Sequence, residues 1–198
     1  MDLLVAAGLG LALGIVTGMP LGVVNVAIVE AALAGKRRFA TGIGVGGALA
    51  DTLHAGVAFV GMGRLVTARP DLVRGLAIAA AILIVGYAII AWRQRPAATP
   101  SDASSATRGA VTGFLLTLPN PGALAAWVAV AAAVWPTASL AEAITVGVGV
   151  GVGSAAWFAV LARWIGTLPR DHAAVRLLPR IALVALVGIA AYGVIRVL

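Results

Sequence analysis

The 198-residue chain contains no cysteine, only two histidines and few charged residues. Without cysteine it can form no disulfide scaffold, thiol redox centre, iron–sulfur cluster or thiolate metal site. Charged residues make up 11% of the chain, whereas a soluble domain carries about 25%. Hydrophobic residues make up 62%, and the mean hydropathy is +1.07. These proportions exclude a soluble enzyme and predict that most of the chain is surrounded by lipid.

The positive charges of the chain do not gather in one segment. There are 14 Lys and Arg residues against 7 Asp and Glu. The basic residues lie between apolar runs, as the loop charges of membrane proteins do, so we expect no nucleic-acid partner. The sequence also has no His or carboxylate cluster with metal-ligand spacing and no Ser, His and Asp set typical of a hydrolase. We therefore expect neither an enzyme nor a bound cofactor.

Six apolar runs predict six membrane-spanning helices, since each span needs about 20 apolar residues. They cover residues 3–33, 40–63, 72–92, 110–134, 140–162 and 178–197. The start of the chain lacks the positive segment of a signal peptide, so we expect the first run to be retained as a span. The glycine-rich stretch 42–47 lies inside a run and predicts a close helix contact rather than a nucleotide loop. The expected fold class is an all-α membrane protein.

The distribution of Lys and Arg predicts the orientation of these spans. Ten of them lie in or beside the first, third and fifth connections, and four lie on the opposite side. Because such residues resist translocation, we expect a plasma-membrane protein with both termini outside. Three arginines in the second connection, Arg64, Arg69 and Arg74, run against this rule.

A polar stretch divides the chain into two similar halves. Residues 96–107 form this linker, between a first unit at 1–95 and a second at 108–198, and each unit holds three runs. An odd number of spans per unit forces the two units into opposite orientations, which predicts a 3+3 inverted repeat.

Two local similarities support this repeat. Residues 41–48 resemble residues 145–152, and the interruption at Pro20 in the first run has a counterpart at 119–121 in the fourth. The alternative is a chance similarity between glycine-rich stretches.

Asp51 and His54 are ionisable residues inside the second run, three positions apart on one helical face. A charge at the centre of a span costs about 2.5 to 3.5 kcal/mol on insertion scales, so such a residue indicates function. The pair predicts a proton relay. The alternative is a hydrogen-bonded pair that only locks two helices together.

Proline and glycine interrupt the first and fourth runs at 18–22 and 118–122. Proline removes a backbone donor and clashes with the preceding turn, so both helices should be broken at membrane depth. Paired breaks point to a substrate site in which half-helix N-termini face an anionic group such as a carboxylate. Asn25 lies beside the first break, where its amide can reach freed backbone groups or a ligand. A kink that serves packing alone is the alternative.

Three further polar or aromatic residues have simpler expected roles. Glu30, near the end of the first run, is expected to form an interfacial ion pair with Lys36 or Arg37. Tyr87 and Trp157 are expected to anchor span ends at the membrane interface.

Four motifs together resemble the LysE superfamily of amino-acid exporters. They are Gly-Met-Pro-Leu-Gly-Val-Val-Asn at 18–25, Gly-Lys-Arg-Arg at 35–38, the glycine-rich second run with Ala50-Asp51, and Asn120-Pro121. The resemblance covers nearly the whole chain, including its length and six runs. The first motif lacks one proline that the family typically has, and Gly122 stands where Lys is common, so the substrate is left open.

The resemblance implies a secondary transporter that exports an amino acid or related small solute by proton antiport, often as a homodimer. It also implies roles for individual residues. Pro20 and Pro121 would frame the site, Asn25 and Asn120 would offer polar contacts, and Asp51 would bind the coupling ion or a substrate ammonium group. Two other functions remain open. One is a divalent-metal transporter of the same fold, which the lack of cysteine disfavours for soft metals; the other is a non-transporting membrane scaffold.

Overall fold

The described part of the chain is helical throughout. A computed structural model describes residues 2–19, 22–61, 68–93, 103–135 and 137–167, with individual positions between 180 and 195. The helices are α1 (Leu3–Gly18), α2 (Val23–Leu33), α3 (Arg37–Phe59), α5 (Pro70–Arg93), α6 (Ala103–Thr117), α7 (Pro121–Val134) and α8 (Leu140–Gly166). The predicted all-α membrane fold is confirmed.

Both predicted helix breaks are present. The axes of α1 and α2 are bent by 65° from each other, and those of α6 and α7 by 72°. The proline of the first break, Pro20, lies outside the described residues. A regular helix that continued through these positions would lose a backbone hydrogen bond at proline and would be destabilised at glycine. The breaks therefore form where the sequence predicts them.

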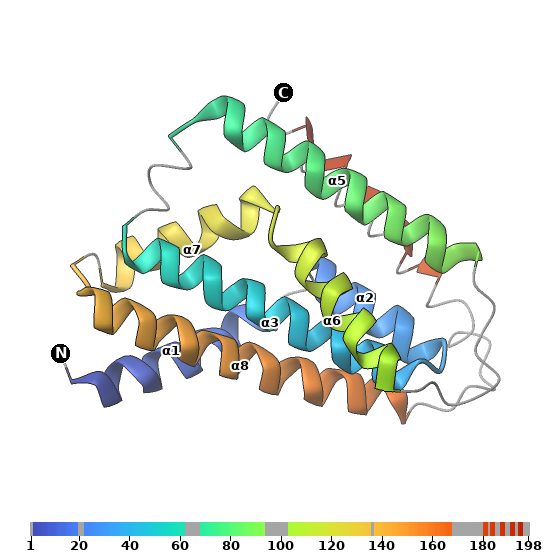
Figure 1. The fold of residues 1–198 in the computed structure, drawn as a ribbon, viewed down its shortest axis with the longest axis horizontal. Coiled ribbons are helices and arrows are strands. Elements are labelled where there is room, and N and C mark those ends of the chain that lie inside the picture. The colour runs from blue at the N-terminus through green and yellow to red at the C-terminus, as the bar shows by residue number, and fades with distance from the viewer. Residues whose placement is uncertain are drawn as a thin grey trace.

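Two of the described helices, α5 and α8, are long and apolar enough to cross a membrane alone, and each bent pair adds one more span if it is counted as a single one. The helix α3 covers the second predicted span and lies at the centre of the bundle (Figure 1). A helix surrounded by protein needs less hydrophobicity than one that faces lipid. The six spans and the inverted repeat stay predictions, because only individual positions of the last run are described.

Glycine permits the closest helix contacts in the bundle. The helix α1 packs along α8, and α3 packs along both α6 and α8. A Cβ atom added at Gly46 would overlap the carbonyl oxygen of Ala110, and one added at Gly14 would overlap that of Val150. Only glycine lets the backbones approach this closely. The close contact predicted for residues 42–47 is confirmed.

Close glycine contacts of this kind form two helix–helix interfaces in the described bundle. Four glycines build each one: Gly42, Gly46, Gly109 and Gly113 between α3 and α6, and Gly10, Gly14, Gly149 and Gly153 between α1 and α8. In this arrangement Gly42 corresponds to Gly149. The sequence comparison of residues 41–48 with 145–152 instead matches Gly42 with Val146, so its register differs from the packing by three residues, close to one helical turn.

Basic residues gather at one end of the bundle. The guanidinium of Arg37, at the start of α3, donates a hydrogen bond to the carbonyl of Gly166 at the end of α8. The backbone of Gly109, near the start of α6, lies against Phe39. These contacts place Arg38 beside Arg37, Arg108 beside Gly109 and Arg163 in the last turn of α8 at one end of the bundle, which the charge distribution predicts to face the cytoplasm.

Candidate functional site

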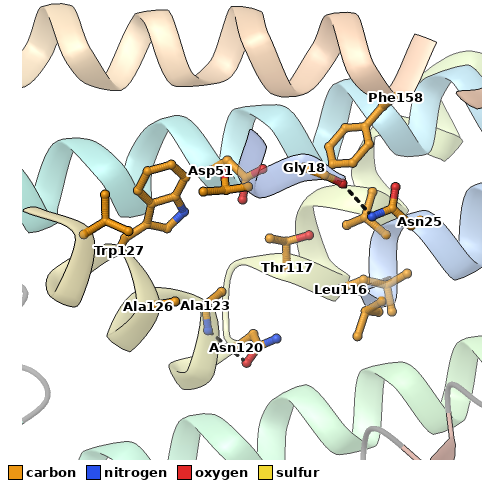
Figure 2. A pocket seen from close by; sticks show the side chains of 15 residues that line it. Gly18, Asn25, Asp51, Leu116, Thr117, Asn120, Ala123, Ala126, Trp127 and Phe158 are labelled. Atoms are coloured by element: carbon orange, nitrogen blue, oxygen red, sulfur yellow. Dashed lines mark hydrogen bonds between the residues drawn. The ribbon is translucent and has the colours of Figure 1, made fainter. Parts of the chain in front are cut away.

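A small cavity lies where the two broken helices meet (Figure 2). Its volume is about 190 Å³. An apolar cavity of about 150 Å³ holds benzene, whereas drug-sized ligands occupy about 300 to 1,000 Å³. The cavity therefore suits a small solute. Its lining comprises Thr17, Gly18, Gly22, Val23, Val24, Asn25, Asp51, Leu116, Thr117, Asn120, Ala123, Ala126, Trp127, Val130 and Phe158.

Asp51 is the one ionisable side chain among these lining residues. The central helix α3 positions it, and its carboxyl group interacts with the side chains of Ser154 from α8 and Trp127 from α7. Figure 2 shows Asp51 between the break of α1 and the indole ring of Trp127. A single carboxyl group with neutral neighbours can hold either a proton or a cationic group of a bound solute.

Asn25 holds the first break in place. Its side chain is buried, and Nδ2 donates a hydrogen bond of 2.8 Å to the carbonyl of Gly18, the last residue of α1. Its Oδ1 accepts a 3.2 Å bond from Nε1 of Trp157 on α8. Asn25 lines the cavity, as its predicted role in solute binding requires, and it also ties both halves of the broken helix to α8. The N–H group of Trp157 therefore binds a residue at this break. The prediction that Trp157 is an interfacial anchor did not include this contact.

Replacing Asn25 by leucine should lower the free energy of unfolding by about 2 to 4 kcal/mol. Leucine has a similar shape, but the change leaves the Gly18 carbonyl and the Trp157 N–H without this partner, and each such buried group costs about 1 to 3 kcal/mol. Trp157→Phe removes only one of the two bonds and should cost less. Chemical unfolding in detergent measures both changes, and equal stability of Asn25→Leu and wild type would contradict the assignment.

The helix α7 begins directly after the second break, and a side chain caps its N-terminus. Asn120 is the N-cap, and its Oδ1 accepts hydrogen bonds from the backbone N–H of Gly122 at 3.0 Å and of Ala123 at 3.4 Å. Pro121 follows in the first turn, where its missing N–H costs nothing. Asn120 lines the cavity, whereas Pro121 lies beside it and is not part of the lining. The predicted role of Pro121 in framing the site stays a prediction.

Replacing Asn120 by alanine should destabilise the protein by about 1 kcal/mol, the usual cost of losing an N-cap. Asn120→Asp keeps an oxygen in the capping position and should remain close to wild type in stability. Thermal unfolding of the purified protein distinguishes the two variants. Equal losses in both would mean that capping is not what Asn120 contributes.

His54 contacts the second break rather than Asp51. It is buried, and Nε2 lies 3.0 Å from the carbonyl oxygen of Leu118. Because a carbonyl only accepts, Nε2 must carry the proton. Within the described part of the chain Nδ1 has no hydrogen-bond partner, and His54 is not among the cavity-lining residues. The predicted proton exchange between Asp51 and His54 stays a prediction.

The start of α2 offers backbone donors to the cavity. Its N-cap is Gly22, which has no side chain to cap the helix, and the first-turn residues Val23 and Val24 line the cavity. The first N–H groups of a helix have no partner within it, and this end carries a partial positive charge. Since Asn120 already caps α7, the start of α2 is the better place for an anionic group.

Sequence reasoning did not single out Trp127, Thr117 and Phe158 as parts of the cavity wall. The signal for Trp127 was an aromatic residue well inside the fourth run rather than at its end. Thr117 directly precedes the break at 118–122. Among the described residues, no three His, Asp or Glu side chains gather where a metal ion could bind.

Comparison with known proteins identifies the family. Neither the curated proteins nor the solved structures give a match to the chain. A family model described as LysE type translocator matches residues 15–196, a range that contains both helix breaks and Asp51. Proteins of this family are membrane transporters of small solutes such as amino acids. The chain therefore belongs to the LysE type translocator family.

Proposed function

We propose that the protein exports an amino acid or a closely related small solute from the cytoplasm across the plasma membrane by proton antiport. The observation that carries this proposal is one small cavity lined both by the carboxyl group of Asp51 and by the uncapped start of α2. An amino acid has two charged ends that match these two features. Its ammonium group would bind Asp51, and its carboxylate would bind the first N–H groups of α2.

The remaining wall of the cavity favours a neutral side chain on the solute. Among the described lining residues, the groups other than Asp51 are apolar, hydroxyl or amide. A second cationic group on the solute would meet no second carboxylate there, and an unpaired charge in such a site is costly. We therefore propose a small neutral amino acid as the transported solute.

Coupling to protons follows from competition at Asp51. Once protonated, the carboxyl group no longer attracts an ammonium group, so a proton and a solute would occupy the site in turn. Protonation from outside and solute binding from inside would then favour opposite states of the transporter. Asn25 and Asn120 would hold the ends of the half-helices that form the walls of the site. Pro20 and Pro121 would prevent a continuous helix from forming at either break.

Efflux from proteoliposomes tests this proposal. Vesicles are loaded with a mixture of the common amino acids, an inwardly directed proton gradient is imposed, and the external medium is analysed by mass spectrometry. We expect gradient-dependent loss of one or a few neutral amino acids, absent from protein-free vesicles and abolished by a protonophore. Loss of no amino acid would contradict the proposal and would favour ion transport or a scaffold role.

A further inference from the structure

A second cavity of about 430 Å³ is lined by a buried acid, Glu30. Glu30 is 4% exposed and belongs to α2. Its Oε2 accepts a 2.8 Å hydrogen bond from the hydroxyl of Tyr87 on α5. The cavity lies between α2, α3, α5 and α6, and its lining is Glu30, Lys36, Phe39, Ile82, Leu83, Gly86, Tyr87, Ile90, Thr112, Leu115 and Leu116.

Of the two partners expected for Glu30, Lys36 acts on it through its charge, and the expected ion pair stays a prediction. Arg37 turns to the carbonyl of Gly166 instead. Lys36 acts on Glu30 through its charge and lines the same cavity. Tyr87, expected as an interfacial anchor, directs its hydroxyl group to Glu30. The carboxyl group therefore lies in a cavity wall with one cationic residue near it.

A buried carboxylate can accept more hydrogen bonds than the one that a single hydroxyl group donates. A carboxylate offers about four acceptor positions, and burying its charge is costly unless it is paired. Among the described residues, the hydroxyl of Tyr87 is the one hydrogen-bond donor to the carboxyl group of Glu30, and the charge of Lys36 acts on the same group. The adjoining cavity leaves room for a further donor that is not part of the chain.

Leu116 belongs to the walls of both this cavity and the one at Asp51. Leu116 lines both cavities and is 2% exposed. Glu30 and Asp51 thus line two cavities that have Leu116 in common. The Glu30 cavity lies toward the basic end of the bundle, because Lys36 in its wall precedes Arg37 at the start of α3.

We propose that the Glu30 cavity is a second solute site, which binds the ammonium group of the transported amino acid before it passes Leu116 to reach Asp51. Glu30 supplies the negative charge that an ammonium group requires, in a cavity that is large enough for a small solute. This assignment as a station on the transport path rests on the proposed function. The affinity of the cavity for organic cations is independent of the proposed function.

The absence of cysteine from the chain allows a direct test. Thr112→Cys places a single thiol in the wall of the Glu30 cavity, and its rates of reaction with a cationic and an anionic methanethiosulfonate reagent are compared. Thr41→Cys is the matched control. Both threonines donate a hydrogen bond to the carbonyl four residues earlier, at the same end of the bundle, but Thr41 is exposed and outside this cavity.

Adding Glu30→Gln should lower the ratio of cationic to anionic rates at Thr112→Cys roughly tenfold. This is the order expected from one carboxylate about 5 Å away at the dielectric constant of water, about 80, because its charge acts with opposite sign on the two reagents. The ratio at Thr41→Cys should change far less. An unchanged ratio at Thr112→Cys would overturn the proposal. So would a failure of either reagent to react there, which would indicate a cavity closed or filled by lipid.

Protection by solute tests the place of the cavity on the transport path. The amino acid that is exported should slow modification of Thr112→Cys, and it should still do so when Asp51 is replaced by asparagine. If Glu30 alters the rate ratio but no amino acid protects the thiol, the cavity binds cations without being a solute station. If amino acids protect but none is exported, the proposed export fails and the second site stands.

Discussion

Replacing Asp51 by asparagine should abolish gradient-driven efflux of the amino acid, with a loss of at least about a hundredfold. Asparagine has nearly the same shape, but it can neither release a proton nor pair with an ammonium group. Removing one partner of a buried ion pair costs about 3 to 5 kcal/mol, which corresponds to a factor of roughly 10² to 4 × 10³. Efflux from proteoliposomes that contain equal amounts of protein measures the change.

Asp71→Asn is the matched control for this variant. Asp71 is an exposed acid in the first turn of α5, outside the residues that line the cavity. Its replacement removes the same charge from the chain and should leave efflux near the wild-type rate. Full proton-coupled efflux by Asp51→Asn would show that Asp51 is not the coupling residue. Equal losses in both variants would attribute the effect to net charge.

Replacing Gly46 by alanine should destabilise the bundle by about 1 to 3 kcal/mol or more, the range observed for overpacked interiors. The new Cβ atom would overlap the carbonyl oxygen of Ala110 and lie 2.7 Å from the backbone nitrogen of Phe114. Both are backbone atoms, so no side chain can rotate away, and α3 and α6 must separate. Chemical unfolding in detergent measures the loss.

Gly56→Ala, on the same helix, is its control. A Cβ atom at Gly56 meets nothing within 4 Å. Alanine is a better helix former than glycine by about 1 kcal/mol, so this variant should be as stable as wild type or more stable. If Gly46→Ala proved equally stable, the close approach of α3 and α6 would be wrong.

The helix breaks could be predicted from the sequence because their cause is local. Proline and glycine near residues 20 and 120 interrupt a helix whatever surrounds them. The cost of polar groups in lipid singled out Asp51 and Asn25, and the family resemblance singled out Asn120; the structure brings all three to one cavity.

The partners of these residues could not be predicted, because they depend on packing between distant segments. Asn25 is bonded to a tryptophan 132 positions away, and His54 to a carbonyl 64 positions away. No local pattern encodes such pairs. The alignment of residues 41–48 with 145–152 was also ambiguous, since glycines at every second position fit several registers, and the glycine contacts correspond in a different one.

The two glycine interfaces have a consequence for synthesis of the protein. The helix α1 belongs to the first half of the chain and packs on α8 of the second, while α6 belongs to the second half and packs on α3 of the first. Each half thus supplies a segment that completes the other (Figure 1). While the ribosome has made only the first half, the glycine faces of α1 and α3 lack these partners. Each half therefore depends on the other for its closest helix contacts. The bundle can complete its folding only after α8 has been translated.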